Sequence, residues 1–441
     1  MIDPKFVMIP AAYKYIGIYP TNQKVYSILP TASPNADFSA GRNSLTPAYV
    51  TPEDTVLEST IDVRLDWQDR KTCPVLWLER SATSRLLWNE NLISGINLGI
   101  WQTSGISALQ VAQDPTNQNK GFVLTNNGTV TSGDFGIKQQ FWGNYGYNVG
   151  YATVSVYVKR IVSYDDLCYI RLKDVLGNRV TMKFDFNNEQ LSLEDFSTWR
   201  GPEKTRVIKA SNGWYRLELS VLTTGYNDCT FEIQPKDRSG ARLQIALPMA
   251  EILPYNGSLN PQGLSHSFIK TEGSLVTQGN EFCYDAESDI FSNNLSGSFF
   301  VELEEVEFTE TVAESMISIS TDDDDDAVQF IFAPEPTLSQ TYSLRARVIA
   351  NGNNVADILI GGFDRLNTIK IAATWDVNYF KLFINGALVG TRTNLGFVPV
   401  QQDRISFANG QQYSNFFGKV NNIQYFDEVI SESQAIQKTT I

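Results

Sequence analysis

Short runs in which apolar and polar residues alternate, separated by turn residues, recur along most of this chain. The run Tyr-Phe-Lys-Leu-Phe-Ile at 379–384 places Phe380, Leu382 and Ile384 on one face of a strand. Asn385 and Gly386 follow it directly, and Asn-Gly between two strand-like runs is the strongest short signal for a β-hairpin. Long amphipathic helical patterns are scarce, and aromatic residues, which favour half-buried sheets, make up 12% of the chain. The sequence therefore predicts a mainly β protein.

Composition and turn spacing divide the 441 residues into three parts. Residues 1–85 are dense in Pro, Tyr and turn residues and contain only short strand-like pieces. Residues 86–288 and 289–441 each contain a series of strand-like runs at a spacing typical of β-sandwiches. We expect two antiparallel β-sandwich (jelly-roll) domains after an irregular N-terminal segment. In the first domain, the three alternating valines of YATVSVYVK, residues 151–159, are predicted to face the core.

The charge balance excludes several classes of protein. The formal net charge is −14 at pH 7 and no basic stripe with interleaved aromatics is present, so we expect no nucleic-acid binding. No apolar run approaches the length of a transmembrane helix, and the first residues lack the cationic and apolar regions of a secretory signal. We therefore expect no membrane insertion and no export by such a signal.

The chain contains four cysteines: Cys73, Cys168, Cys229 and Cys283. They form no CxxC pair, which argues against a zinc or redox site. Four thiols in a chain of this length do not make a disulfide scaffold. The sequence predicts buried free thiols and no cofactor.

Two segments of the C-terminal part resemble the laminin-G or concanavalin-like sandwich family. A strand ending in Trp375 leads into the Asn-Gly hairpin, and Phe416-Phe417-Gly418 later precedes a last strand and a short helical turn. The middle part is similar to carbohydrate-binding-module-like jelly rolls of phage virion proteins. That resemblance rests on YATVSVYVKR, IRLKDVLGNRVTMKFDF and, above all, the Asn-Gly-Trp-Tyr-Arg unit at 212–216.

The leading segment resembles the start of phage tail and fibre proteins. The pieces that carry the resemblance are IPAAYKYIGIYPTNQKVYSILPT, DFSAGRNSLTP and CPVLWLERSATSRLLWNENLI. The resemblance implies a non-enzymatic structural component of a bacteriophage virion, a tail or head fibre or appendage, assembled in the host cytoplasm. It also implies a homo-oligomer, most often a trimer, whose sandwiches present surfaces for host or glycan adhesion. A glycan-degrading enzyme and a bacterial surface adhesin are the alternatives.

The richest cluster of potential stacking aromatics is FWGNYGYNVGY, residues 141–151. Trp142, Tyr145, Tyr147 and Tyr151 lie there among glycines and asparagines, a composition that suits carbohydrate recognition as well as a packed loop. Trp142, Tyr145 and Tyr147 are the predicted carbohydrate-binding residues. The loops at 322–326 and 409–413 are the second choice.

Three features that could carry chemistry have simpler interpretations. His266, the only histidine, has no nucleophile elbow before it and is expected in a linker. The glutamates in FFVELEEVEF, residues 299–308, lack the aspartate of a glycosidase motif and are expected on a solvated strand face. The five consecutive aspartates at 322–326 point in different directions, so we expect a solvated hairpin tip. A loose divalent-ion site remains the alternative. No catalytic or metal residue is predicted.

The leading segment carries many apolar side chains and little alternation. Exposed, such a patch would be a liability. We therefore expect residues 1–85 to be ordered only against another virion protein or a second copy of the chain. The apolar residues concerned are Phe6, Ile9, Tyr13, Tyr15, Ile18, Tyr19, Tyr26 and Ile28.

Overall fold

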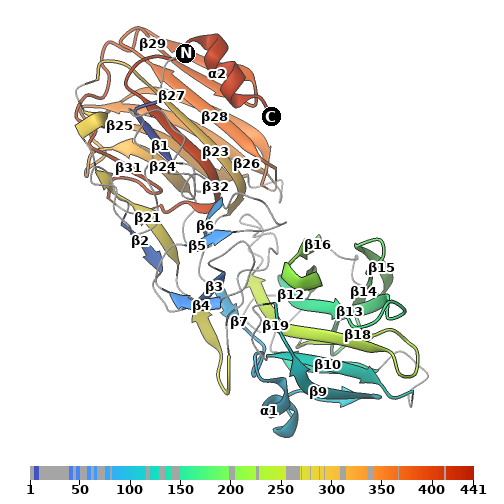
Figure 1. The fold of residues 1–441 in the computed structure, drawn as a ribbon. Coiled ribbons are helices and arrows are strands. Elements are labelled where there is room, and N and C mark those ends of the chain that lie inside the picture. Colours follow the sequence, from blue (N-terminus) through green and yellow to red (C-terminus); the bar gives the residue numbers. More distant parts are fainter. Residues whose placement is uncertain are drawn as a thin grey trace.

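The computed structural model describes most of the chain. The described residues are 4–8, 39–42, 46–49, 57–60, 64–66, 75–79, 82–115, 120–128, 135–141, 149–197, 204–224, 228–254, 269, 271–278, 280–287, 289–292, 294–307, 314–335, 341–365, 367–411 and 414–441. Two β-sandwiches of antiparallel sheets account for most of them and lie at opposite ends of the view in Figure 1. The prediction of a mainly β fold with antiparallel sandwiches is confirmed.

The first sandwich consists of two six-stranded sheets. One sheet has the order β16 (Lys204–Lys209), β17 (Tyr215–Thr224), β12 (Val149–Arg160), β19 (Arg242–Pro254), β10 (Gly121–Asn126) and β9 (Ile106–Ala112). The other has the order β15 (Gln190–Ser197), β14 (Arg179–Asp185), β13 (Leu167–Asp174), β18 (Cys229–Pro235), β11 (Gly136–Phe141) and β8 (Gln102–Ser104).

The core of the first sandwich follows the alternation of its strands. Val154, Val156 and Val158 of β12 are fully buried, as predicted, in one cluster with Ile170 and Phe231 of the other sheet. Full burial of a side chain of this size contributes about 1.5–3 kcal/mol. Cys168 and Cys229 lie in the same cluster as free thiols. The prediction of buried free thiols is confirmed for these two and for Cys283, while Cys73 lies outside the described residues.

The outward face of the sheet containing β12 is also buried. Thr153, Ser155 and Glu218, whose side chains point away from the core, are each at most 3% exposed. The outward face of the opposite sheet, that of β13, is instead half-buried along alternate residues. In the first sandwich, the sheet containing β13 therefore carries the more accessible face.

The second sandwich is built from an eight-stranded and a six-stranded sheet. The first has the order β30 (Ala387–Thr393), β29 (Tyr379–Ile384), β28 (Ile369–Trp375), β23 (Gly297–Glu307), β32 (Phe417–Phe426), β6 (Val75–Leu78) and β5 (Arg64–Asp66), with β1 (Phe6–Met8) also paired to β32. The second has the order β22 (Ala286–Glu287), β31 (Arg404–Ser406), β24 (Ser315–Ser320), β25 (Ala327–Pro334), β26 (Thr341–Ala350) and β27 (Asn353–Asp364).

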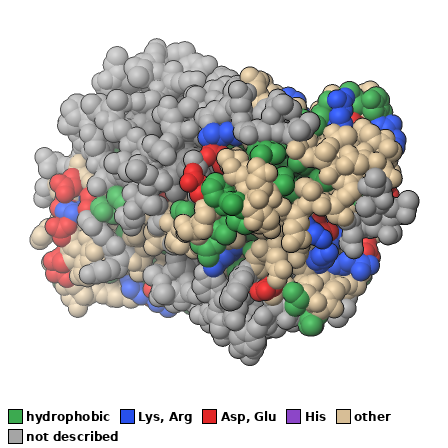
Figure 2. All heavy atoms as spheres, turned by 90° about the horizontal axis from the view of Figure 1, so that it is seen from below, with side chains coloured by type: hydrophobic (Ala, Val, Ile, Leu, Met, Phe, Trp, Pro, Cys, Tyr) green, Lys and Arg blue, Asp and Glu red, His purple; other side chains and the backbone are tan. Residues whose placement is uncertain are grey.

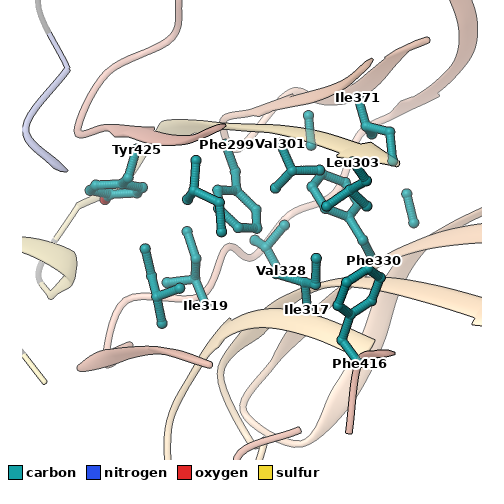
Figure 3. Close-up of a cluster of buried hydrophobic side chains, with 14 of the residues drawn as sticks. Phe299, Val301, Leu303, Ile317, Ile319, Val328, Phe330, Ile371, Phe416 and Tyr425 are labelled. Atoms are coloured by element: carbon teal, nitrogen blue, oxygen red, sulfur yellow. The ribbon is translucent and has the colours of Figure 1, made fainter. Parts of the chain in front are cut away.

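Aromatic and branched side chains from both sheets fill this second core (Figure 3). Phe299 of β23 and Phe330 of β25 stack across it, with ring centroids 5.1 Å apart and an interplanar angle of 5°. Ile317 and Ile319 of β24 face Val301 of β23 in the same cluster. The contacts join the two sheets, so each sheet depends on the other for burial of its apolar face.

The predicted hairpin at Asn385-Gly386 is confirmed. Both residues have positive φ, 48° and 82°, which is the geometry of the two-residue turn that Asn-Gly favours. Phe380, Leu382 and Ile384 face the core, as expected. Beyond them, the short edge strand β30 is largely exposed.

Helices are few and short in the described part of the chain. They are α1 (Leu92–Asn97), α2 (Glu432–Thr439) and the 3₁₀ turns η3 (Ser211–Gly213) and η4 (Asp289–Phe291). The capping box of Ser431 and Gln434 starts α2, which extends the helical turn expected near the end of the chain. Among the helices described, none has the length and apolar character needed to cross a membrane.

Strands from the leading segment belong to the second sandwich. β1 pairs with β32 in the register Phe6 to Tyr425, and Phe6 and Met8 are fully buried. Leu76 and Leu78 of β6 enter the same core beside β32. The expectation that the leading segment is ordered only against another chain is therefore wrong for β1 and β6, because their partner is a strand of the same chain. The other predicted apolar residues, between 9 and 28, lie outside the described residues.

Three small two-stranded sheets complete the described strands, and the first two named here connect distant parts of the chain. β2 (Ser39–Arg42) pairs with β21 (Glu281–Tyr284), β7 (Ala82–Ser84) with β20 (Val276–Gln278), and β3 (Thr46–Tyr49) with β4 (Leu57–Thr60). Figure 1 shows these strands between the two sandwiches. The boundaries at 85 and 288 stay predictions, although strands on either side of the first one pair with each other.

Charged side chains join the two sandwiches directly. Arg206 of β16 lies 2.9 Å from Glu305 of β23 and 2.7 Å from Glu218 of β17. Lys419 of β32 approaches the other oxygen of Glu305 at 3.0 Å, and the Glu305 side chain is only 15% exposed. The expectation of a solvated glutamate face is thus wrong at Glu305, and also at Glu307, which is 7% exposed.

Candidate functional site

The predicted aromatic cluster divides at the edge of the described residues. Trp142, Tyr145 and Tyr147 lie outside them. Tyr151 is described: it lies in β12 and is only 5% exposed. The expectation that Tyr151 is a surface aromatic is therefore wrong, because strand pairing buries it, and the sugar-binding role of the other three residues stays a prediction.

The aspartate run forms the loop between β24 and β25, as expected, but its members are not equivalent. Asp326 is buried, and its carboxylate accepts hydrogen bonds from the backbone N–H groups of Asn351 and Gln401, each at 3.0 Å. Asp324 accepts from the N–H of Gly410 at 2.9 Å. These two aspartates tie neighbouring loops together, and only part of the run is solvated.

Asp322, with two acidic residues from outside the run, surrounds Arg404. Its guanidinium pairs with Asp322 and donates to Asp403 at 2.7 Å, and it lies 3.6 Å from Asp285. Thr321, Asp323 and Asp325 also line an open hollow at this place. Among the described residues, no three His, Cys, Asp or Glu side chains are arranged to hold a metal ion. The contacts account for the acidic run as a structural element.

Removing the Asp326 carboxylate should destabilise the second sandwich. Asp326→Ala removes the buried charged acceptor of two part-buried N–H groups, so we expect a loss of about 2–4 kcal/mol of unfolding free energy. Asp325→Ala, at an exposed position in the same loop, is the control and should cost less than about 0.5 kcal/mol. Denaturant unfolding of both variants measures the difference. Equal stability of the two would contradict the structural role of Asp326.

A polar surface covers the outward face of the β13 sheet; Thr181, Glu232 and Gln234 are buried in it, and its other side chains are half-buried. We call this surface the polar face. In one row across the strands, Lys183, Tyr169 and Gln234 are neighbours. The outward side chains that define it are Lys138, Tyr169, Arg171, Lys173, Thr181, Lys183, Glu232 and Gln234. In Figure 2, basic and hydrophobic side chains lie close together on the side of the first sandwich.

Glu232 organises the centre of the polar face. Its side chain is 4% exposed and lies 3.2 Å from the Arg171 guanidinium and 2.5 Å from the Lys173 ammonium. Arg171 also donates through Nε to the Thr181 hydroxyl at 2.9 Å. A buried carboxylate with two cationic partners holds those long side chains in fixed positions. The face is therefore preorganised.

Tyr169 gives the polar face an aromatic ring. Burial, followed by the charge of Glu194, raises the pKa of Tyr169 above its ordinary value of 10. Lys183 beside it lies 2.8 Å from Glu194 and is 34% exposed. An aromatic ring flanked by fixed donors and acceptors offers the apolar and hydrogen-bonding contacts that a sugar ring requires.

The polar face has no arrangement suited to acid–base hydrolysis. Among the described residues, the carboxylate of the face and two on the neighbouring strand β15 have cationic partners: Glu232 pairs with Arg171, Glu194 with Lys183, and Asp195 with Arg179 at 2.6 Å. Glycosidases need two carboxyl groups facing one bond, one of them protonated. The geometry of this face therefore favours binding.

Sequence reasoning missed the polar face. The signal was the alternation in CYIRLKD, residues 168–174, in which aromatic and basic residues occupy every second position. A run of this kind on the open side of a sheet marks a polar surface. Which side was open depends on the packing of the other sheet, and the sequence does not contain that information directly.

Solved structures of other proteins are similar to about a third of this chain. No family model matches the chain, and no curated protein matches it. The carbohydrate-binding module CBM40 of the Ruminococcus gnavus IT-sialidase is 14% identical, with a TM-score of 0.26, over 34% of this chain and 85% of that one. A SAP-like pentraxin from Limulus polyphemus is 12% identical, with a TM-score of 0.25, over 32% of this chain and 69% of that one. The binding domain of botulinum neurotoxin serotype G is 11% identical, with a TM-score of 0.27, over 36% of this chain and 39% of that one. No residue role is carried over from these structures.

Proposed function

We propose that this protein is a non-catalytic glycan-binding protein and that a sugar binds on the polar face. The observation that supports the proposal is the row of Lys183, Tyr169 and Gln234 beside the preorganised Arg171–Glu232 pair. The ring of Tyr169 supplies a stacking surface, and Lys183, which is 34% exposed, supplies a donor for hydroxyl groups, while the buried Gln234 supports the ring from the other side.

The biological setting that we propose is a bacteriophage virion, in which the chain is a fibre or appendage protein assembled in the host cytoplasm. The sequence resemblance of the leading segment supports this setting. Single sugar sites on sheet faces are shallow and weak, so a homo-oligomer with several copies per particle would raise the effective affinity by about 10²–10⁴. A bacterial surface adhesin is the alternative with the same binding role. Labelled antibodies on purified phage particles distinguish the two.

Glycan binding should depend on the ring of Tyr169. We expect Tyr169→Ala to weaken binding at least about 10-fold on a glycan array and in calorimetry, because stacking and desolvation of the ring are lost. Tyr169→Phe, which keeps the ring, should retain most of the affinity. Tyr164→Ala is the matched control, since Tyr164 is 54% exposed and lies outside the polar face. Equal binding by wild type and Tyr169→Ala would remove the polar face as the site.

A second measurement separates binding from catalysis. We expect no release of reducing ends from a bound polysaccharide, because Glu232 on the polar face and Glu194 and Asp195 on the neighbouring strand β15 have cationic partners. Accumulation of reducing ends with the wild-type protein, and its loss on Glu302→Gln or Glu304→Gln, would support the glycan-degrading alternative instead.

A further inference from the structure

Two arginines stand side by side on the outward face of the second sandwich. The strand β26 alternates strictly, with Ala346 and Val348 buried in the core and Arg345 and Arg347 pointing outward. Asp357 on β27 is the direct cross-strand neighbour of Arg347. We call Arg345, Arg347 and Asp357 the arginine pair site.

The guanidinium groups of this site are held without hydrogen bonds. Arg345 Nε lies 3.6 Å and Arg347 Nε 3.9 Å from the two oxygens of Asp357, and the three side chains are 36%, 26% and 35% exposed. Both Nε atoms are buried and have no hydrogen-bond partner within the described residues. By contrast, Arg179 and Arg404 donate to carboxylates at 2.6 and 2.7 Å.

Among the residues that the structure describes, the charge of the site is not balanced. Two guanidinium groups share one carboxylate, so one positive charge is left over. Glu335, at the Thr341 end of these strands, is engaged elsewhere: it accepts from the Gly362 N–H at 2.9 Å and from the Thr341 hydroxyl at 2.6 Å. The chain as a whole carries −14, but at physiological salt distant charges are screened beyond about 8 Å. The site therefore attracts a single negative charge locally.

The buried Nε atoms cannot reach a ligand, but the exposed parts of both guanidinium groups can, and they favour a planar oxyanion. A carboxylate matches the fork of an arginine with two parallel hydrogen bonds, and two adjacent arginines can hold it from both sides. Asp357 would repel a doubly charged phosphate, yet it can accept hydrogen bonds from neutral hydroxyl groups. An acidic peptide offers a carboxylate but seldom a hydroxyl next to it. A hexuronic acid offers both on one ring.

We propose that the arginine pair site binds an acidic sugar residue of the uronic acid class. The sugar carboxylate lies on Arg345 and Arg347, and a ring hydroxyl donates to Asp357. The arginine pair site lies on a different sandwich from the polar face. It adds a second, charge-selective binding site to the proposed glycan-binding function, and each of the two sites can be tested without the other.

Calorimetry on the full chain tests the proposal with a tetramer of galacturonic acid and its fully methyl-esterified form. We expect the wild type to bind the acid at least about 10-fold more tightly than the ester, because charge-assisted hydrogen bonds require the carboxylate. The double variant Arg345→Gln/Arg347→Gln should lose that preference. Arg392→Gln, which changes an exposed arginine on β30, should keep it. Binding of the ester reports the polar face, whereas the difference between acid and ester reports the arginine pair site.

Several results would overturn the proposal. They are equal affinity for acid and ester, no binding of the acid, and a preference that survives in the double variant. Tighter binding of inorganic phosphate than of the uronic acid would assign the site to phosphorylated ligands instead. Thermal unfolding of the double variant within about 2 °C of wild type shows that it is folded, which is expected because both arginines point outward.

Discussion

Phe6→Ala should lower the free energy of unfolding of the second sandwich by about 3–5 kcal/mol, the range typical of large-to-small changes of buried aromatic residues. Phe6 is fully buried and its ring lies 5.7 Å from that of Phe291, which in turn packs edge-on against Tyr425 at 5.1 Å. Truncation therefore opens a cavity between the leading strand and the core of the second sandwich.

Lys5→Ala is the control for this experiment. Lys5 directly precedes Phe6 in the chain, its side chain is 54% exposed, and its ion pair with Asp427 at 3.5 Å is a surface contact. Such pairs contribute about 0–1 kcal/mol. Urea unfolding that resolves the second-sandwich transition measures both variants. A Phe6→Ala protein as stable as Lys5→Ala would show that β1 is not part of the core in solution.

The position of β1 limits how the leading segment could attach the chain to a particle. β1 and β6 pair with β32 of the same chain, so these strands are not available to pair with another protein. If the chain is a virion appendage, its contact with other virion proteins uses surfaces or segments other than the buried faces of these strands. Deletion of β1 would then reduce stability of the chain first and incorporation into particles only as a consequence.

Local signals in the sequence predicted local structure well. The Asn385-Gly386 turn, the alternating valines of β12 and the helical turn before the chain end all depend on residues a few positions apart. The fold class followed from the same signals, because alternation and turn spacing recur in most of the strands.

Pairings between distant residues were not predictable in the same way. Phe6 pairs with Tyr425 across more than four hundred residues, and nothing in the short run around Phe6 indicates that partner. The candidate site suffered from the same limitation. Tyr151 was expected on the surface because it belongs to a glycine-rich aromatic run, but sheet formation buries it. Tyr169 was overlooked because its exposure depends on which sheet of the first sandwich is covered.

The glutamate run shows how one contact can reverse an expectation. From the sequence, Glu305 belongs to a strand with several acidic residues, which is typical of a solvated face. In the structure, Arg206 from the first sandwich and Lys419 from β32 enclose it, and Lys419 also lies 4.5 Å from the ring centre of Trp77 on β6. The cluster thus joins the two sandwiches and the leading segment at one place.

The charges in this cluster make the stability of the second sandwich depend on pH. Burial by itself raises the pKa of Glu305, but Arg206, Lys419 and Lys204 outweigh that effect and lower the pKa to about 2 from an ordinary value of 4.5. A carboxyl group whose folded pKa is depressed stabilises the folded state above its unfolded pKa, and that contribution disappears as the pH falls from about 4.5 to about 2. The shift corresponds to about 3 kcal/mol.

We therefore expect the second sandwich to lose about 3 kcal/mol of stability between pH 5 and pH 2 through Glu305 alone. In Glu305→Gln this part of the pH dependence should be absent, because no proton is taken up at that position. Glu287→Gln, at a side chain that is 69% exposed, should leave it unchanged.

Arg206→Ala changes the same ion pair from the side of the first sandwich. At neutral pH it should lower the free energy of unfolding more than Glu305→Gln does. It removes one cation from a buried carboxylate that keeps Lys419, so we expect a loss of about 3–5 kcal/mol. Because Arg206 is also the direct link between the sandwiches, small-angle scattering should show a larger radius of gyration for this variant. An unchanged radius together with unchanged stability would mean that the ion pair does not hold the sandwiches together, and that other contacts cover the buried outward face of the β12 sheet.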